Sequence, residues 1–217
     1  MSRSAFLRAR RPEHKQQRRE AILAAACELA RTSGVRNVTL GAVADAVGLA
    51  KSNIVRYFGT REEIFLVLAA EEWRSWAAAA GARVATAGDT TDVMRALAET
   101  LVDRPLFCDL LANSATSLEH NVSVDAARVF KHATLAAAAE LGGQVARATG
   151  LTEREGLELT VVAAGLAGML YPAAHPSPAL AQLYAEDPEL AAARPELLPS
   201  LVRALSAFAA GLPTVRD

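Results

Sequence analysis

The stretch GLAKSNIVRYFGTREEIF, residues 48–65, contains the pattern that decides the fold. Gly48 closes one short apolar segment, and Gly59-Thr60 closes the next. Ile54 and Phe58 are four residues apart, so they lie on one side of a helix. The stretch therefore predicts a short helix over about 50–57 with an apolar inner side and a polar outer side. Two short helices joined by a turn that contains glycine are typical of a helix-turn-helix unit.

The segments before this stretch complete a three-helix domain. A first helix is expected over about 14–32, ending at Gly34, with apolar residues at helical spacing: Ile22, Ala26, Leu29 and Ala30. Thr39 is a good N-cap for a second helix, whose inner side has Leu40, Val43, Ala44 and Val47. The small residues Ala44, Ala46 and Gly48 allow the next helix to cross it closely.

The rest of the chain also predicts helices and no convincing strand, so the fold class is all-α. Thr60 caps a long helix and has Glu63 at capping-box spacing. Helices are expected near 60–85, 89–103, 105–120, 123–149, 152–172 and 198–211, with a shorter one over 179–192. Gly142-Gly143 can kink the longest of them. We expect a flexible basic arm at 1–12, a helix-turn-helix domain at 13–59 and a helical bundle at 60–217.

Charge is divided unevenly along the chain. Residues 1–61 hold twelve Lys/Arg and four Asp/Glu, whereas residues 62–217 hold eleven and twenty. A basic N-terminal region followed by an acidic remainder indicates that the N-terminal region binds a polyanion, although a solvated basic tail is the simpler alternative. No window reaches the roughly 18 uncharged apolar residues of a membrane span, and the N-terminus lacks the apolar core of a signal peptide. Cys27 and Cys108 have no disulfide or metal spacing, which favours the cytoplasm.

The outer side of the helix over 50–57 has groove-reading chemistry. Steps of 100° from Ile54 place Ser52 and Arg56 opposite the core, with Asn53 and Val55 on the flanks. Arg56 can pair with guanine, Asn53 with adenine, and Val55 can touch a thymine methyl. The residues better placed for phosphates are Lys51, Tyr57, Thr60 and Arg61. A solvated face on a three-helix core is the alternative.

Residues 13–65, which include RREAILAAACELARTSGVRNVTLGAVADAVGLAKSNIVRYFGTREEIF, resemble the DNA-binding domain of the tetracycline-repressor (TetR) family of bacterial transcriptional regulators. The carrying features are the order and spacing of G…VTL…VADAVGLA and YFGTREEIF. The resemblance implies that Thr39 and Tyr57 hold backbone phosphates. It also implies that Lys51, Ser52, Asn53 and Arg56 face the groove.

This sequence departs from the family pattern at three positions. Val55 stands where members commonly have a tyrosine. The loss of that tyrosine removes one expected phosphate contact, and with it the basis for transferring a base preference from the family to this chain. Ala50 replaces a serine cap, at a local cost of about 1 kcal/mol, and Arg61 replaces the usual lysine at the head of the fourth helix. Ahead of the domain, the arm carries Arg3, Arg8, Arg10 and Arg11. These can enter a minor groove, or act only as a non-specific electrostatic tail, which we favour.

For the remaining two-thirds, the resemblance implies a body that binds a small effector among its middle helices and forms a homodimer through its last two long helices. Small and apolar residues on those helices support the dimer: Leu157, Val161, Ala164, Gly165, Gly168, Leu201, Leu205 and Phe208. Burial of these residues inside one subunit is the alternative. The candidate effector-pocket residues are Trp73, Trp76, Phe107, Leu111, Asn113, Ser117, His120, Phe130, His132 and Met169. No charge dominates this set, so a hydrophobic effector is favoured.

The sequence contains no catalytic constellation. Cys108 and Asp109 are neighbours that point about 100° apart on a helix, and there is no GxSxG, HExxH or phosphate-binding glycine loop. We therefore expect a dimeric, effector-released repressor that binds an operator in double-stranded DNA and needs no cofactor or metal. An architectural or cell-division DNA-binding protein without an effector is the second hypothesis, and a helical enzyme is the third.

Overall fold

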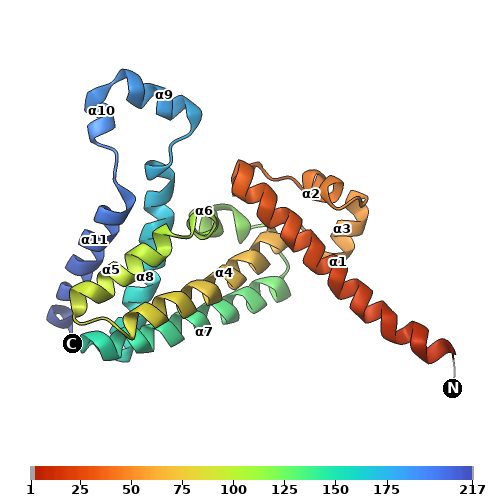
Figure 1. The fold of residues 1–217 in the computed structure, drawn as a ribbon, viewed down its shortest axis with the longest axis horizontal. Coiled ribbons are helices and arrows are strands. Elements are labelled where there is room, and N and C mark those ends of the chain that lie inside the picture. The colour runs from red at the N-terminus through yellow and green to blue at the C-terminus, as the bar shows by residue number, and fades with distance from the viewer. Residues whose placement is uncertain (1–2, 217) are drawn as a thin grey trace.

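The computed structural model describes residues 3–216, and over that range the chain forms helices and no strand (Figure 1). The first part contains α1 (Arg3–Ser33), the 3₁₀ turn η1 (Val35–Asn37), α2 (Leu40–Ala46), α3 (Lys51–Phe58) and α4 (Arg61–Val84). The second part contains α5 (Thr90–Val102), α6 (Pro105–Asn113), the π-helical turn η2 (Ser114–Leu118), α7 (Val124–Thr149) and α8 (Glu153–Ala174). The chain ends with α9 (Pro178–Glu186), α10 (Pro188–Ala192), α11 (Leu197–Gly211) and η3 (Leu212–Val215).

Side-chain caps start most of the helices where the sequence predicts them. The hydroxyls of Thr39, Thr60 and Thr152 each accept a hydrogen bond from a backbone N–H in the first turn of α2, α4 and α8. After α2, Gly48 adopts φ 64°, and the N–H of Leu49 donates to the carbonyl of Ala44 at 2.9 Å. This left-handed ending turns the chain sharply, so that α3 follows at once across α2.

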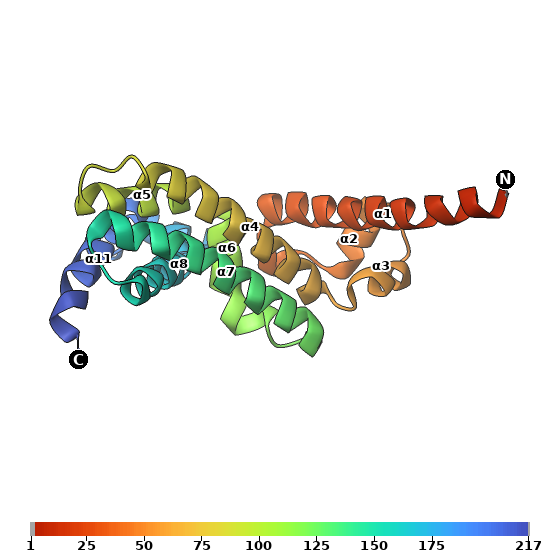
Figure 2. The ribbon, with the colours of Figure 1, turned by 90° about the horizontal axis from the view of Figure 1, so that it is seen from below.

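Two apolar cores lie end to end, and α4 runs through both. The first core joins the inner sides of α1, α2 and α3 to the N-terminal half of α4 and to Leu106, Leu110, Leu118 and Phe130. The second joins the C-terminal half of α4 to α5, α6, α7, α8 and α11. Both views show α4 and α7 side by side from one lobe to the other (Figures 1 and 2). One helix therefore contributes to both cores.

Glycines permit the closest helix contact of the body. A Cβ on Gly142 of α7 would lie 2.7 Å from backbone atoms of Leu157 in α8, and a Cβ on Gly156 would meet the carbonyl oxygen of Gly142. These two helices therefore cross with their backbones nearly touching. The helix α7 continues through Gly142-Gly143, so these glycines do not end it, and the kink stays a prediction.

Three sequence-based boundaries differ from the structure. The helix expected over 14–32 begins instead at Arg3 and passes through Pro12, and it projects away from the lobe (Figure 2). Whether residues 1–12 are mobile stays a prediction. The helix expected over 105–120 ends as α6 at Asn113 and continues as the wider π turn η2. The segment expected as one helix over 179–192 is divided at Asp187-Pro188, because Asp187 caps α10 and proline favours a first helical position.

Two helical stretches within residues 3–216 are long and apolar enough to cross a membrane by length and composition, namely Glu153–Ala174 and Leu197–Val215. Both stretches contain charged residues, Glu158 and Arg203 among them, so they pass this test without being uncharged throughout. Core helices of water-soluble proteins pass the same test, and both stretches contribute buried residues to the body core. The finding shows only that these helices have large apolar surfaces.

Candidate nucleic-acid interface and interdomain cavity

The outer face of α3 is arranged as the sequence predicts. Ile54 and Phe58 are buried at 0% and 3% exposure and hold the helix against the first core. The side chains on the opposite face are exposed: Lys51, Ser52, Asn53, Val55 and Arg56. Tyr57 is half-buried at the edge of this face. The face therefore presents guanidinium, ammonium, amide and hydroxyl groups to solvent on a short helix, as groove reading requires.

Cations of α1 extend this face and were missed by the sequence reasoning. Lys15 and Arg18 line one hollow together with Asn53, Arg56 and Tyr57. Lys15 and Arg18 are three residues apart, so they share a side of α1, and both are exposed. The same spacing was visible in the sequence, but only the crossing of α1 over α3 shows which side meets the recognition face. We define the recognition surface as Lys15, Arg18 and the outer face of α3.

Two residues expected at phosphates have other partners. The guanidinium of Arg61 donates to the backbone carbonyls of Val35 and Val38 and to the carboxylate of Glu62, and it lies over the ring of Phe65. The hydroxyl of Thr60 donates to the carbonyl of Asn121 at 2.8 Å while it accepts from the N–H of Glu63.

The Arg61 expectation is therefore corrected: this side chain fastens α4 to the η1 segment, and it is mostly buried. Thr60 fastens α4 to the loop before α7. Thr39 stays exposed at the start of α2, and its phosphate role stays a prediction.

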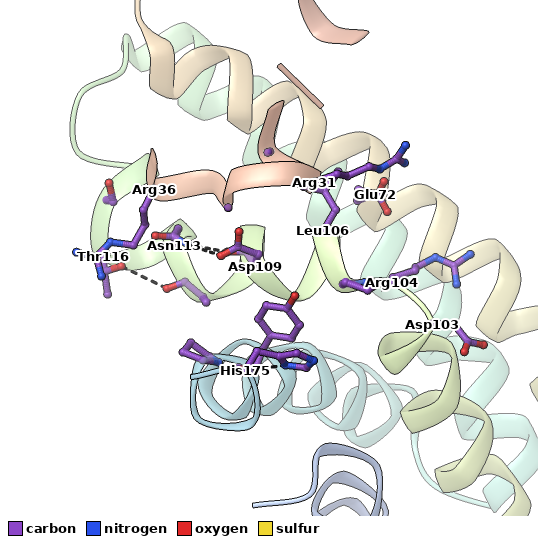
Figure 3. A pocket seen from close by; sticks show the side chains of 17 residues that line it. Arg31, Arg36, Glu72, Asp103, Arg104, Leu106, Asp109, Asn113, Thr116 and His175 are labelled. Atoms are coloured by element: carbon purple, nitrogen blue, oxygen red, sulfur yellow. Dashed lines mark hydrogen bonds between the residues drawn. The ribbon is translucent and has the colours of Figure 1, made fainter. Parts of the chain in front are cut away.

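A cavity of about 1090 Å³ lies where the N-terminal lobe meets the body (Figure 3). Its wall on the lobe side comes from the end of α1, Gly34 and η1, and its other walls come from α4, the α5–α6 junction, α6, η2 and the end of α8. The charged lining residues are Arg31, Arg36, Glu72, Asp103, Arg104 and Asp109. Apolar lining includes Leu106, Ala112 and Pro172. A molecule in this cavity would touch both lobes at once.

Asp109 of α6 is the direct tie between the lobes inside this cavity. One of its carboxylate oxygens accepts from the N–H of Val35 at 2.7 Å, and the other accepts from the amide of Asn113 at 3.0 Å. Burial raises the pKa of the Tyr171 phenol, and the charge of Asp109 raises it further. Burial also raises the pKa of Glu72, and the nearby Arg104 and Arg31 partly offset this. The cavity is thus a polar, charged environment.

The predicted effector residues divide between the core, the surface and this cavity. Trp73 packs edge to face against Trp76 and Phe107 within the body core, with ring centroids 5.4 and 5.5 Å apart, and none of the three lines the cavity. Asn113 and Ser117 do line it. The other five lie elsewhere: Leu111 packs half-buried against the body core, Phe130 is buried in the first core, His120 and His132 are exposed, and Met169 is 64% exposed.

The expected residues do not line one cavity together, and their contact with an effector stays a prediction. The aromatic side chains were expected to contact a ligand because they are large and apolar, and the same property buries them against one another. The cavity residues that the sequence reasoning missed, Arg36, Tyr171 and His175 among them, come from segments far apart in the chain. Its charged lining also differs from the hydrophobic effector that the sequence favoured.

The predicted dimer residues also divide. Ala164, Leu201 and Leu205 are buried in their own subunit, and a Cβ on Gly168 would lie 2.9 Å from Leu111 of α6, so Gly168 serves an internal contact. Leu157 and Phe208 are half-buried against the body core. Val161 and Gly165 are exposed, and nothing lies within 4 Å of a Cβ built on Gly165. With Met169 they form a stripe at four-residue spacing along the outside of α8.

Together the fold and the recognition surface define a helix-turn-helix DNA-binding regulator. The family model for bacterial regulatory proteins of the tetR family matches residues 22–68, and the model for the tetracyclin repressor-like C-terminal domain matches residues 70–216. The chain therefore belongs to the TetR family of transcriptional regulators. No curated protein matches it.

Two solved structures share the fold. A TetR-family transcriptional repressor, FadR of Thermus thermophilus, in complex with lauroyl-CoA, is 19% identical with a TM-score of 0.58, and the match covers 92% of this chain and 96% of that one. A possible TetR family transcriptional regulator from Streptomyces coelicolor A3(2) is 23% identical with a TM-score of 0.57, covering 91% and 100%. At these identities the likeness shows the common architecture.

Proposed function

We propose that this regulator is a homodimeric repressor that binds an operator in double-stranded DNA and is released by a small effector held in the interdomain cavity. The observation that carries the proposal is the recognition surface: an exposed polar and basic face on α3, with its apolar side buried and with Lys15 and Arg18 beside it. DNA binding is expected because the chain belongs to the TetR family. The dimer, the repression and the effector are the parts that the experiments below test.

The residues of the recognition surface have separate roles in this proposal. Arg56 and Asn53 contact base edges, which gives sequence preference. Lys51, Lys15 and Arg18 contact phosphates, which gives affinity that falls with salt. Both groups are needed, because phosphate contacts set the register in which the base contacts are read.

The dimer is supported by apolar surface that one subunit leaves uncovered. The stripe of Val161, Gly165 and Met169 on α8 is exposed, with Val161 at 48% and Met169 at 64%. Exposed apolar contacts of this kind are typical of protein interfaces. In a two-fold dimer, α8 and α11 of each subunit would form a four-helix bundle. The recognition helices would then stand about 34 Å apart, one DNA turn, and enter successive major grooves.

Effector release is supported by the contacts that fasten the lobe to the cavity walls. On one side, Asp109 of α6 accepts from the N–H of Val35. On the other, the loop after η2 grips the first turn of α4: the N–H of Ser123 donates to Glu63 at 3.0 Å, and Asn121 contacts Glu62 and Thr60. A ligand that displaces α6 or η2 would therefore shift both the η1 segment and the start of α4.

Such a shift changes the distance between the two recognition helices in the dimer. A ligand that prefers the shifted arrangement by a few kcal/mol lowers the population able to span the operator. The Thermus repressor that shares the fold is solved with lauroyl-CoA bound. This supports the view that a protein of this architecture can hold a small molecule.

Selection of duplexes from a random-sequence library, followed by mobility shift, tests the proposal. We expect a two-fold symmetric site bound by two subunits. Arg56→Ala should relax preference at one base position in each half-site and cost about 1–3 kcal/mol there. Arg95→Ala is the matched control, since Arg95 is an exposed arginine on α5 away from the recognition surface. An Arg56→Ala protein with unchanged sequence preference would contradict the assigned face.

A further inference from the structure

The interdomain cavity has two chemically different ends. Figure 3 places Arg31, Glu72, Asp103 and Arg104 at one end, Asp109 and Asn113 in the middle, and Arg36 with Thr116 at the other end. The first end mixes two cations with two carboxylates. Among the described lining residues, the Arg36 end contributes a cation and hydroxyls without a carboxylate of its own.

Within the described part of the chain, the donors of the Arg36 side chain have no acceptor. Its guanidinium forms no hydrogen bond or ion pair with any residue whose side chain the structure describes. The nearest acidic lining residue along the cavity, Asp109, already uses one oxygen for Val35 and the other for Asn113. The five N–H groups of Arg36 are therefore available to an acceptor that enters the cavity.

The facing wall supplies a second donor on an unusual backbone. Thr116 and Ser117 belong to the π-helical turn η2, and π turns inside helices are frequent at functional sites. The Thr116 hydroxyl donates to the carbonyl of Ala112. The hydroxyl of Ser117 has no such partner among the described side chains, so it can donate into the cavity.

We propose that this end of the cavity binds the carboxylate of a small organic acid between the guanidinium of Arg36 and the hydroxyl of Ser117. Guanidinium and carboxylate are matched in charge and in planar geometry, which favours a bidentate pair. The rest of the acid lies along Leu106, Ala112 and Pro172, which are apolar lining residues of the same cavity. The ligand class is thus an amphiphilic carboxylate.

A ligand bound in this way contacts the DNA-binding lobe and the body at the same time. Arg36 belongs to η1 of the DNA-binding lobe, and Ser117 belongs to η2 of the body. The bound carboxylate therefore adds a new tie beside the Asp109–Val35 bond and pulls η1 toward η2. Its role as the effector that changes DNA affinity rests on the function proposed above, whereas its binding does not.

Isothermal titration of the full-length protein with matched acids and amides tests the proposal. The probes are octanoate with octanamide and 2-naphthoate with 2-naphthamide, which have nearly the same shape and differ in charge. We expect each acid to bind at least about tenfold more tightly than its amide, because hydrogen bonds to charged groups are the stronger kind. Arg36→Ala should abolish this difference, and Ser117→Ala should reduce it.

Arg95→Ala is the control for loss of an exposed arginine and should keep the full preference for acids. Arg36 is exposed and forms no internal bond, so Arg36→Ala should unfold at the temperature of the unchanged protein. Equal binding of acids and amides overturns the proposal. So does an acid preference that survives Arg36→Ala, or no binding of either acid at millimolar concentration.

DNA affinity measured in parallel separates this proposal from the function above. Binding of acids that depends on Arg36 but leaves operator affinity unchanged supports the carboxylate site and contradicts its role as the effector site. Operator binding by a protein that treats acids and amides alike supports the DNA-binding function and overturns the carboxylate site.

Discussion

Replacing Arg61 by alanine should weaken the fold of the DNA-binding lobe and leave its electrostatic contact with DNA unchanged. The side chain is 16% exposed, and its guanidinium donates to the carbonyls of Val35 and Val38, two residues that are themselves buried. Its planar group also lies 4.7 Å from the ring centroid of Phe65. The substitution thus removes these two bonds and the ion pair with Glu62, and it leaves two buried carbonyls without these donors.

A hydrogen bond to a charged group contributes about 1.5–3 kcal/mol, and part of this is recovered when water reaches the exposed side. We therefore expect Arg61→Ala to lower the free energy of unfolding by about 2–4 kcal/mol. Urea unfolding followed by circular dichroism at one protein concentration measures this loss. Arg56→Ala, on the exposed face of α3, is the control and should change stability by less than about 0.5 kcal/mol.

The same variant distinguishes this structural role from the phosphate contact that the sequence suggests. If Arg61 does not touch DNA, the slope of log affinity against log salt stays unchanged at temperatures where the variant is folded. Unchanged stability together with a slope smaller by about one unit would refute the structural role.

Three further sets of substitutions test the dimer interface, the phosphate contacts and one ion pair. Gly165→Arg adds a side chain where the subunit has open space, so the protein should stay folded but become monomeric by light scattering. Gly168→Ala adds a methyl group against the backbone of α6, so it should instead lower thermal stability. A dimeric Gly165→Arg protein would contradict the α8 interface. Lys15→Ala and Arg18→Ala should each reduce the salt slope by about one unit without changing the selected sequence, and a changed sequence with an unchanged slope would contradict their assignment to phosphates. The bidentate pair of Glu155 with Arg216 lowers the pKa of Glu155 from its ordinary value of 4.5 to about 2. The pair therefore stabilises the fold fully above about pH 4.5, and its contribution is lost as the pH falls toward 2. Arg216→Ala should lose stability near neutral pH and less in strong acid; an equal loss at every pH would count against this pair.

Local signals in the sequence predict most of this fold. Thr39 and Thr60 cap helices at the expected places, because a hydroxyl before an apolar periodic segment satisfies the first free N–H groups. The inner side of α3 follows from Ile54 and Phe58 alone. The structure departs from the predicted helices at two places. Asp187-Pro188 begins a new helix inside the one expected over 179–192, and the chain after Asn113 forms a π turn.

The sites depend on contacts between distant segments, and this limits what the sequence reveals. Arg61 has the charge for a phosphate contact, yet its neighbours in space are the carbonyls of η1, 23 and 26 residues earlier. The hydrogen bond from the N–H of Val35 to Asp109 joins residues 74 apart in the chain, and no local sequence pattern predicts it. The outward face of α3 was predictable because a single short helix determines it.

The central claim is that two recognition surfaces of one dimer bind a single operator. Hydroxyl-radical footprinting of the full-length protein on a duplex selected from random sequence tests it most directly. We expect two protected half-sites related by two-fold symmetry, with centres about 34 Å apart on one face of the DNA helix. A single unpaired half-site, or no protection of any duplex at low salt, would contradict it.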